Sequence, residues 1–120
     1  MAETRAIWAA GNEYLTKAAP WTHYKTDVDQ AAIGVRTGLN LVALFGIIAQ
    51  PVIPDAAAKI LDAMGIPETN RTWNFGDKSG IADLIDALPH GLAISAPDVL
   101  FAKIEDTDVE IWANRFGGGE

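Results

Sequence analysis

Apolar residues recur at helical spacing near the start of the chain. Between Thr4 and Ala18, a stripe is formed by Trp8, Gly11, Leu15 and Ala18. Intervals of three and four residues place these positions on one face of an α-helix. The segment is therefore predicted to be an amphipathic helix that packs on a core through this face.

A second and longer helix is predicted after a polar turn. Thr26 or Asp27 suits its N-cap, because a short polar side chain there accepts a hydrogen bond from the first turn. Pro51 sets its end near Gln50, since proline cannot continue a helix.

The two halves of this second helix differ in pattern. The apolar face of the first half is expected to comprise Val28, Ala32, Val35 and Leu39. The second half, residues 39–49, is apolar on all sides except at Asn40. A helix that is apolar all round is usually buried, so we expect this half to be enclosed on several sides.

A third helix is predicted from Pro54, which the first turn tolerates, to just before Gly65, which suits the position after a helix end. Its apolar face is formed by Ile60, Leu61 and Met64. Short connections containing proline make the three helices neighbours in an antiparallel bundle. The predicted fold class is all-α, one domain over residues 1–120 with a three-helix core over residues 1–66.

Residues 67–120 are predicted to form a less regular C-terminal extension. Thr69–Lys78 has the composition of a loop, with Trp73 and Phe75 as anchors, and Gly91–Phe101 is expected to be extended. Between them, Ser79 suits the start of a short helix that ends near Leu88.

The extension is predicted to end in a helix over Asp106–Phe116. Its apolar stripe consists of Val109, Trp112 and Phe116. The acidic residues around its start are interpreted as capping groups that complement the helix dipole. They are Glu105, Asp106, Asp108 and Glu110.

Composition excludes several kinds of site. The chain has no cysteine, which rules out disulfides, thiolate zinc sites and cysteine nucleophiles. His23 and His90 have no evident catalytic partners, and Lys78–Ser79 lacks the upstream glycine spacing of a phosphate-binding loop. No catalytic, cofactor-binding or metal-binding residue is predicted in this chain.

Charge and hydropathy limit the kinds of partner that the chain is expected to bind. The net charge of −7 argues against non-specific nucleic-acid binding. Acidic and basic side chains balance within residues 1–36, so this third of the chain is the candidate for any phosphate contact. No secretory signal is evident, and the apolar stretch over residues 38–54 is interrupted by polar residues and prolines. A cytoplasmic protein that does not contact a membrane is expected.

Trp21 is the most informative single residue, because it follows the proline that ends the first helix. A large aromatic side chain on such a loop is either a staple packed on the bundle or a recognition residue held out for a flat ligand. Lys17 and Lys25 flank Trp21 and are candidates for phosphate contacts, with solvated surface lysines as the alternative.

The surroundings of Trp21 resemble a known family. The pattern consists of Asn12, Tyr14, Ala19-Pro20-Trp21 and Lys25. The similarity continues through Gln50–Pro54, Ala57–Gly65 and Pro97–Glu105. On these motifs the whole chain resembles the C-terminal anticodon-binding domain of bacterial methionyl-tRNA synthetase, a class I aminoacyl-tRNA synthetase with a bundle of the class Ia type.

The resemblance implies that the chain recognises the anticodon of methionine tRNA within a longer ligase. In this family the tryptophan that matches Trp21 stacks on the cytosine of the CAU anticodon. The parent enzyme uses ATP and often carries zinc, but its catalytic motifs are absent from this sequence, so the chain alone is expected to be inactive. The alternative is a freestanding helical module, derived from such a domain, that serves protein interaction or oligomerisation.

The resemblance also implies that some apolar surface of this chain is not covered by neighbouring helices. The family's bundle contains more helices than this chain supplies, so residues 39–49 are expected to lose part of their cover. The C-terminal stripe of Val109, Trp112 and Phe116 is expected to lose its partner too. Exposed apolar surface favours self-association, and a homodimer is predicted.

Overall fold

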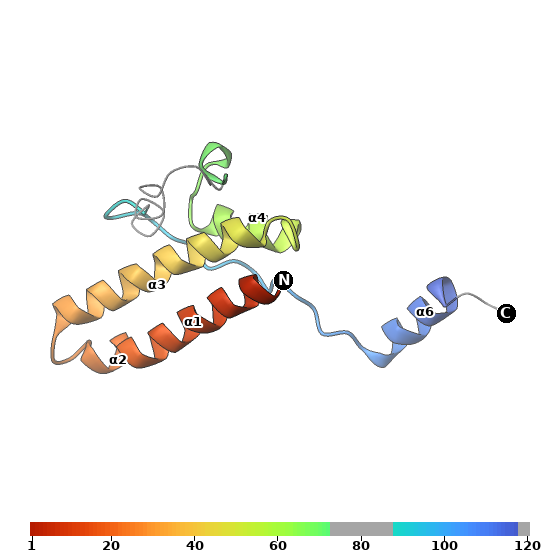
Figure 1. The fold of residues 1–120 in the computed structure, drawn as a ribbon, viewed down its shortest axis with the longest axis horizontal. Helices are drawn as coiled ribbons and strands as arrows, with labels where there is room; N and C mark the ends of the chain where they lie inside the picture. Colours follow the sequence, from red (N-terminus) through yellow and green to blue (C-terminus); the bar gives the residue numbers. More distant parts are fainter. Residues whose placement is uncertain (73–87, 118–120) are drawn as a thin grey trace.

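The computed structural model describes residues 1–72 and 88–117, and this part of the chain is all-helical (Figure 1). Its α-helices are α1 (Ala2–Ala18), α2 (Pro20–His23), α3 (Val28–Ala49), α4 (Pro54–Ala63) and α6 (Asp106–Phe116). A 3₁₀ turn covers Glu68–Asn70. No strand occurs among the described residues, which confirms the predicted all-α class. The predicted anchors Trp73 and Phe75, and the helix expected from Ser79, lie outside the described residues.

The helix α3 is the centre of the fold. It contacts α1, α2 and α4. Figure 1 shows α1 and α3 running antiparallel along most of their length, with α4 against the C-terminal part of α3. The predicted antiparallel bundle is therefore built around this one helix.

The helix ends lie where the sequence predicts them. Asp27 is the N-cap of α3, and its carboxylate accepts a hydrogen bond from the Gln30 N–H at 3.0 Å. The helix α4 begins at Pro54, and Gly65 follows its end with a φ of +65°. A left-handed residue at this position suits glycine, because other residues meet a steric penalty there.

Glycines let α1 approach α3 closely. A Cβ atom on Gly11 would lie 2.3 Å from Cζ of Phe45, and one on Gly38 would lie 2.7 Å from Cδ2 of Leu15. Both distances are well inside van der Waals contact, so the side chains of Phe45 and Leu15 occupy space that any larger residue would need. The predicted inner face of α1 is thus confirmed at Gly11 and Leu15.

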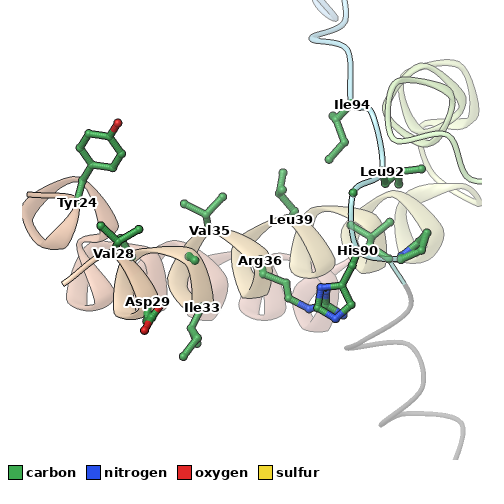
Figure 2. Close-up of a pocket in the computed structure, with 15 residues that line it drawn as sticks. Tyr24, Val28, Asp29, Ile33, Val35, Arg36, Leu39, His90, Leu92 and Ile94 are labelled. Atoms are coloured by element: carbon green, nitrogen blue, oxygen red, sulfur yellow. The ribbon is translucent and has the colours of Figure 1, made fainter.

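The prediction for the first half of α3 was wrong about which face packs. The buried positions are Ala31, Gly34 and Gly38. In contrast, Val28 is 64% exposed and Val35 is 49% exposed. Figure 2 shows Val28 and Val35 directed to one open side of α3. The physical reason is side-chain size: α1 and α2 pack closely against the small residues, which leaves the larger aliphatic face without a covering helix.

The second half of α3 is enclosed, as predicted. Every residue from 39 to 50 is buried or half-buried. By length and composition alone, α3 would be able to cross a membrane, but a buried core helix passes the same test. The packing of α1 and α4 around this half gives it the environment of a core helix. The expected loss of cover therefore falls on the first half, at Val28 and Val35, and not on residues 39–49.

A buried asparagine ties the C-terminal extension to α3. Asn40 is 1% exposed. Its Nδ2 donates to the carbonyl of Arg36 at 3.0 Å, and its Oδ1 accepts from the Leu88 N–H at 3.0 Å. Leu88 in turn joins the hydrophobic core with Ala43 and Met64. Because both ends of the amide have partners, this polar group is buried without an unsatisfied atom.

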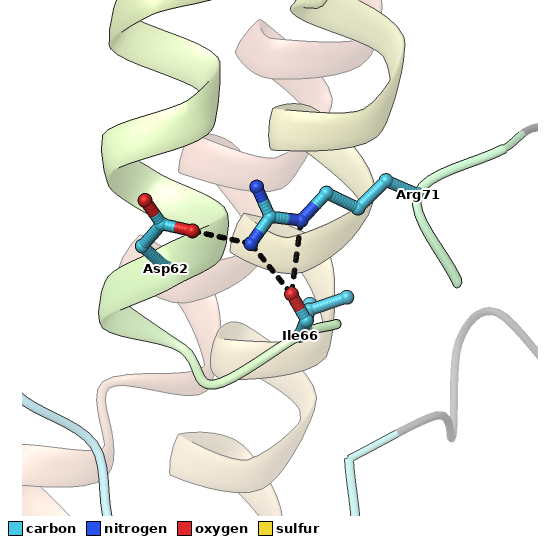
Figure 3. Close-up of polar contacts among 3 residues, drawn as sticks. All are labelled: Asp62, Ile66 and Arg71. Carbon is cyan, nitrogen blue, oxygen red and sulfur yellow. Dashed lines mark hydrogen bonds and ion pairs between the residues drawn. The ribbon is translucent and has the colours of Figure 1, made fainter. Parts of the chain in front are cut away.

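Arg71 fixes the loop that follows α4 (Figure 3). Its guanidinium donates from Nε at 2.9 Å and from Nη2 at 2.6 Å to the carbonyl of Ile66, and Nη2 also pairs with the Asp62 carboxylate. The Arg71 carbonyl accepts a hydrogen bond from Nε2 of Gln50 at 2.7 Å. These bonds hold the loop against the C-terminal ends of both α4 and α3.

The C-terminal helix stands apart from the bundle in Figure 1. The radius of gyration is 18.1 Å, whereas a compact chain of this length has about 14 Å. The predicted capping role is confirmed for two of the four acidic residues, because Glu105 and Asp108 form a reciprocal capping box. The predicted apolar stripe of α6 is uncovered: Val109 is 53%, Trp112 47% and Phe116 71% exposed.

Replacing Asn40 tests the tie between α3 and the extension. Asn40→Ala leaves the Leu88 N–H buried without its acceptor, so we expect the free energy of unfolding to fall by about 1–3 kcal/mol. Urea denaturation measures this loss, and hydrogen exchange should accelerate at the Leu88 amide. Asn12→Ala, on the exposed surface of α1, is the matched control: it brings the same gain in helix propensity, and it should neither lower the free energy of unfolding nor accelerate exchange at Leu88. Unchanged protection of Leu88 in Asn40→Ala would contradict this role.

Candidate nucleic-acid interface

A left-handed alanine sets the turn that carries the candidate residues. Ala19 has φ 37° and ψ 57°, and it is both the C-cap of α1 and the N-cap of α2. Its N–H donates to the Leu15 carbonyl at 3.0 Å, while its carbonyl accepts from the Thr22 N–H at 2.8 Å. The residue before a proline is disfavoured in the right-handed α region, so Pro20 enforces the break after α1.

Pro20 anchors this turn on α3. The proline is buried, and a Cβ atom on Gly34 would lie 3.3 Å from Cβ of Pro20. Proline is well placed at the first position of a helix, where no hydrogen bond from its nitrogen is needed. The sequence placed Trp21 on a loop, but the structure places it in the single turn of α2, directly after this anchor.

Trp21 projects from the turn into solvent. The side chain is 67% exposed, so it is not a staple buried in the bundle. The indole is instead available to a flat ligand, and the buried Pro20 beside it holds its backbone in place. This arrangement gives the exposed ring a fixed attachment point.

Tyr24 is a second exposed aromatic residue on the same turn, and sequence reasoning missed it. It is 68% exposed, and its N–H donates to the Pro20 carbonyl at 3.0 Å. Residues three apart on a helical turn are neighbours on its surface. The interval between Trp21 and Tyr24 is the sequence signal that could have identified it.

The two candidate lysines have different surroundings. Lys17, in the last turn of α1, donates from Nζ to the Glu13 carboxylate at 2.6 Å. Lys25, between α2 and α3, is exposed and makes no hydrogen bond or ion pair with the described part of the chain. All three predicted site residues thus lie at the end of the bundle where α1 turns into α3. Of the two lysines, Lys25 is the one whose ammonium group has no partner within residues 1–72 and 88–117.

An open apolar groove with a volume of about 660 Å³ runs from this turn along α3 (Figure 2). Its walls include Tyr24, Val28 and Val35 on one side and Leu92 and Ile94 on the other. At its far end, Nη1 of Arg36 donates to Nδ1 of His90 at 2.8 Å. His90 is therefore held by α3, and its Nδ1 serves as the acceptor of that bond.

The described residues offer no cluster of side chains for metal binding. Across residues 1–72 and 88–117, no three His, Asp or Glu side chains gather closely enough to hold a metal ion. His23 is half-buried on α2, and it is the only candidate histidine on the turn itself. The chemistry that this end of the bundle supports is contact with a flat, apolar ligand.

Comparisons with known proteins give one consistent result. Residues 1–120 match the family model described as the anticodon binding domain of methionyl tRNA ligase. The chain is 68% identical over 117 residues to a methionine–tRNA ligase of Maricaulis maris, covering 98% of this chain and 20% of that protein. It is 69% identical over 120 residues to the ligase of Hyphomonas neptunium, covering 99% of this chain and 21% of that protein.

A more distant relative agrees with these two. The methionine–tRNA ligase of Caulobacter vibrioides is 51% identical over 116 residues, which are 97% of this chain and 20% of that protein. The chain therefore spans about a fifth of the length of the curated relatives it matches. No solved structure matches the chain.

Replacing two adjacent alanines by glycine tests the turn, because the expected changes in the free energy of unfolding have opposite signs. Left-handed geometry costs an L-residue about 1–2 kcal/mol, and glycine avoids this cost but loses more entropy on folding. Ala19→Gly should therefore raise the free energy of unfolding by roughly 0.5–1 kcal/mol. Ala18→Gly, in the last turn of α1, should lower it by about 1 kcal/mol. Thermal and urea unfolding of both variants measure the difference, and destabilisation by Ala19→Gly would contradict the left-handed assignment.

Proposed function

Because this chain belongs to the family of anticodon-binding domains of methionyl tRNA ligase, we propose that it binds the anticodon loop of methionine tRNA as part of a longer ligase. The observation that carries the proposal is Trp21, an exposed indole fixed beside a buried proline. Stacking of a base on an aromatic ring contributes about 1–3 kcal/mol and acts where bases are splayed out of a loop. Trp21 is the residue that we assign to this contact, with the cytosine of the CAU anticodon as its base.

Phosphate contacts are assigned to the two lysines beside the turn. Lys25 meets a phosphate without breaking any ion pair with the described residues, whereas Lys17 must share its ammonium with Glu13. An exposed pair of this kind is worth only about 0.3–0.5 kcal/mol, so a phosphate can compete with it. With a net charge of −7 for the whole chain, we expect these contacts to orient the loop rather than dominate affinity.

Catalysis is proposed to reside in the remainder of the longer protein. This chain spans about a fifth of its relatives, and ATP, and zinc where it is present, are assigned to the parts outside it. We expect the chain alone to be inactive and the whole protein to be cytoplasmic. The alternative of a freestanding interaction module is not favoured, because the family match covers residues 1–120.

Self-association through uncovered apolar surface is a further part of the proposal. The stripe of Val109, Trp112 and Phe116 is at least 47% exposed at each position, on a helix that stands apart from the bundle. Covering apolar surface of this kind with a second copy removes it from water, which is favourable. We propose that the isolated chain forms a homodimer in which α6 contributes this stripe.

Trp21→Ala tests the stacking assignment. Loss of one stacked base should weaken binding of a methionine tRNA transcript by about 5- to 150-fold, and Trp21→Phe should restore part of the affinity. Titrations at one fixed salt concentration measure this, because phosphate contacts make affinity depend on salt. Phe101→Ala removes an exposed aromatic side chain that lies outside both the turn and the α6 stripe, and it is the control. Equal binding by Trp21→Ala and the unmodified chain would rule out the assignment.

Sedimentation of the chain at increasing concentration tests the proposed homodimer. The double variant Val109→Ser, Phe116→Ser should remain monomeric at concentrations where the unmodified chain associates. Ile111→Ser is the matched control, since Ile111 is 59% exposed but lies on another face of α6. A monomeric unmodified chain at every concentration would exclude self-association through this stripe.

A further inference from the structure

The turn presents two aromatic rings, and only one of them has a proposed role. Trp21 is 67% exposed and Tyr24 is 68% exposed, whereas the aromatic residues Trp8 and Tyr14 on α1 are each 37% exposed. Figure 2 shows the ring of Tyr24 standing clear of α3, with its hydroxyl directed away from the helix. No hydrogen bond joins that hydroxyl to the described residues. Tyr24 is thus a large ring that lies mostly in solvent, at the end of the groove that Val28 and Val35 also line.

The backbone holds Tyr24 firmly even though its side chain is free. Tyr24 has φ −52° and ψ −33°, which continue the helical turn of α2. Its own N–H donates to the Pro20 carbonyl at 3.0 Å, and the N–H groups of Thr26 and Asp27 donate to the His23 carbonyl at 3.0 and 2.8 Å. A ring on a fixed backbone loses little conformational entropy when a ligand stacks on it, which favours binding.

The spacing of the two rings suits consecutive nucleotides of one strand. Residues three apart on a helical turn have Cβ atoms about 5–6 Å apart, so Trp21 and Tyr24 occupy neighbouring positions on one surface. We propose that Tyr24 is a second stacking platform, which receives a base next to the one on Trp21 in the single-stranded tRNA loop. This inference rests on the proposed function and adds a second base-binding position to it.

One lysine and two aspartates follow Tyr24 in the sequence, so any favourable charge contact with a nucleic-acid strand is local to Lys25. Lys25 follows Tyr24 directly, and its ammonium has no partner among the described residues, so it is available to a phosphate that links two stacked bases. Of the nearby carboxylates, Asp27 is already engaged with the Gln30 N–H at 3.0 Å, and Asp29 lies within the first turn of α3. Trp21 and Tyr24 would supply stacking, and Lys25 would supply one phosphate contact. This combination suits a strand with unpaired bases.

Substitutions at Tyr24 separate stacking from other contacts. Tyr24→Ala should weaken binding of the full chain to a methionine tRNA transcript by about 5- to 150-fold, the factor expected for one stacked base. Tyr24→Phe keeps the ring and should bind within roughly a factor of three of the unmodified chain. Tyr24→Leu keeps apolar bulk without the aromatic face and should resemble Tyr24→Ala. Thermal unfolding should be the same for all three, because the side chain is exposed.

The outcomes distinguish this inference from the proposed function. If Tyr24→Leu binds as well as Tyr24→Phe, the residue makes a general apolar contact, as for a protein partner, and the stacking role is overturned. If Tyr24→Ala binds like the unmodified chain while Trp21→Ala is impaired, the second platform is wrong and the proposed function stands. If neither substitution weakens binding, both are wrong.

Discussion

Close contact with α3 is the constraint on which the rest of the structure depends. Where α1 and α4 cross it, side chains fill the places that Cβ atoms would take: a Cβ on Gly11 would lie 2.3 Å from Phe45, and one on Gly46 would lie 2.8 Å from Leu61. Packing at this distance leaves every residue from 39 to 50 buried or half-buried, with Asn40 as a buried polar group that binds the Leu88 N–H. The small residues of α3 thus decide which of its faces is covered and which remains open.

The same packing positions the candidate interface. Pro20 lies against Gly34 of α3, and the left-handed Ala19 connects that anchor to the end of α1. With the proline buried, the next side chain in the turn, Trp21, points to solvent. The exposure of the indole is therefore a consequence of core packing one residue away, and it follows from the order Ala-Pro-Trp on a helix that ends beside α3.

Local signals in the sequence predicted the helix ends. They could not predict which face of α3 packs, because that depends on how well side-chain sizes fit between helices. Asp27, Pro54 and Gly65 set their boundaries through capping and backbone geometry, which involve only near neighbours. The packed face of α3 was predicted incorrectly, because hydrophobicity favoured Val28 while close approach of another helix required glycine and alanine. For the interface, the pattern around Trp21 and the family resemblance identified one ring. Tyr24 was missed because the turn was predicted as a loop, where an interval of three residues has no meaning.

The proposed stacking on this turn would supply affinity rather than discrimination. Every base has a π-face, so rings at Trp21 and Tyr24 would accept any nucleotide sequence, whereas selecting CAU requires hydrogen bonds to base edges. Between residues 19 and 27, Asp27 is used as the cap of α3 and His23 is half-buried. The exposed side-chain groups that could meet a base edge there are the Trp21 indole N–H and the hydroxyls of Thr22 and Tyr24. An ammonium such as that of Lys25 meets phosphates without regard to sequence. The turn is therefore suited to hold a splayed loop, and under the proposed function most of the groups that read its bases are expected outside residues 19–27.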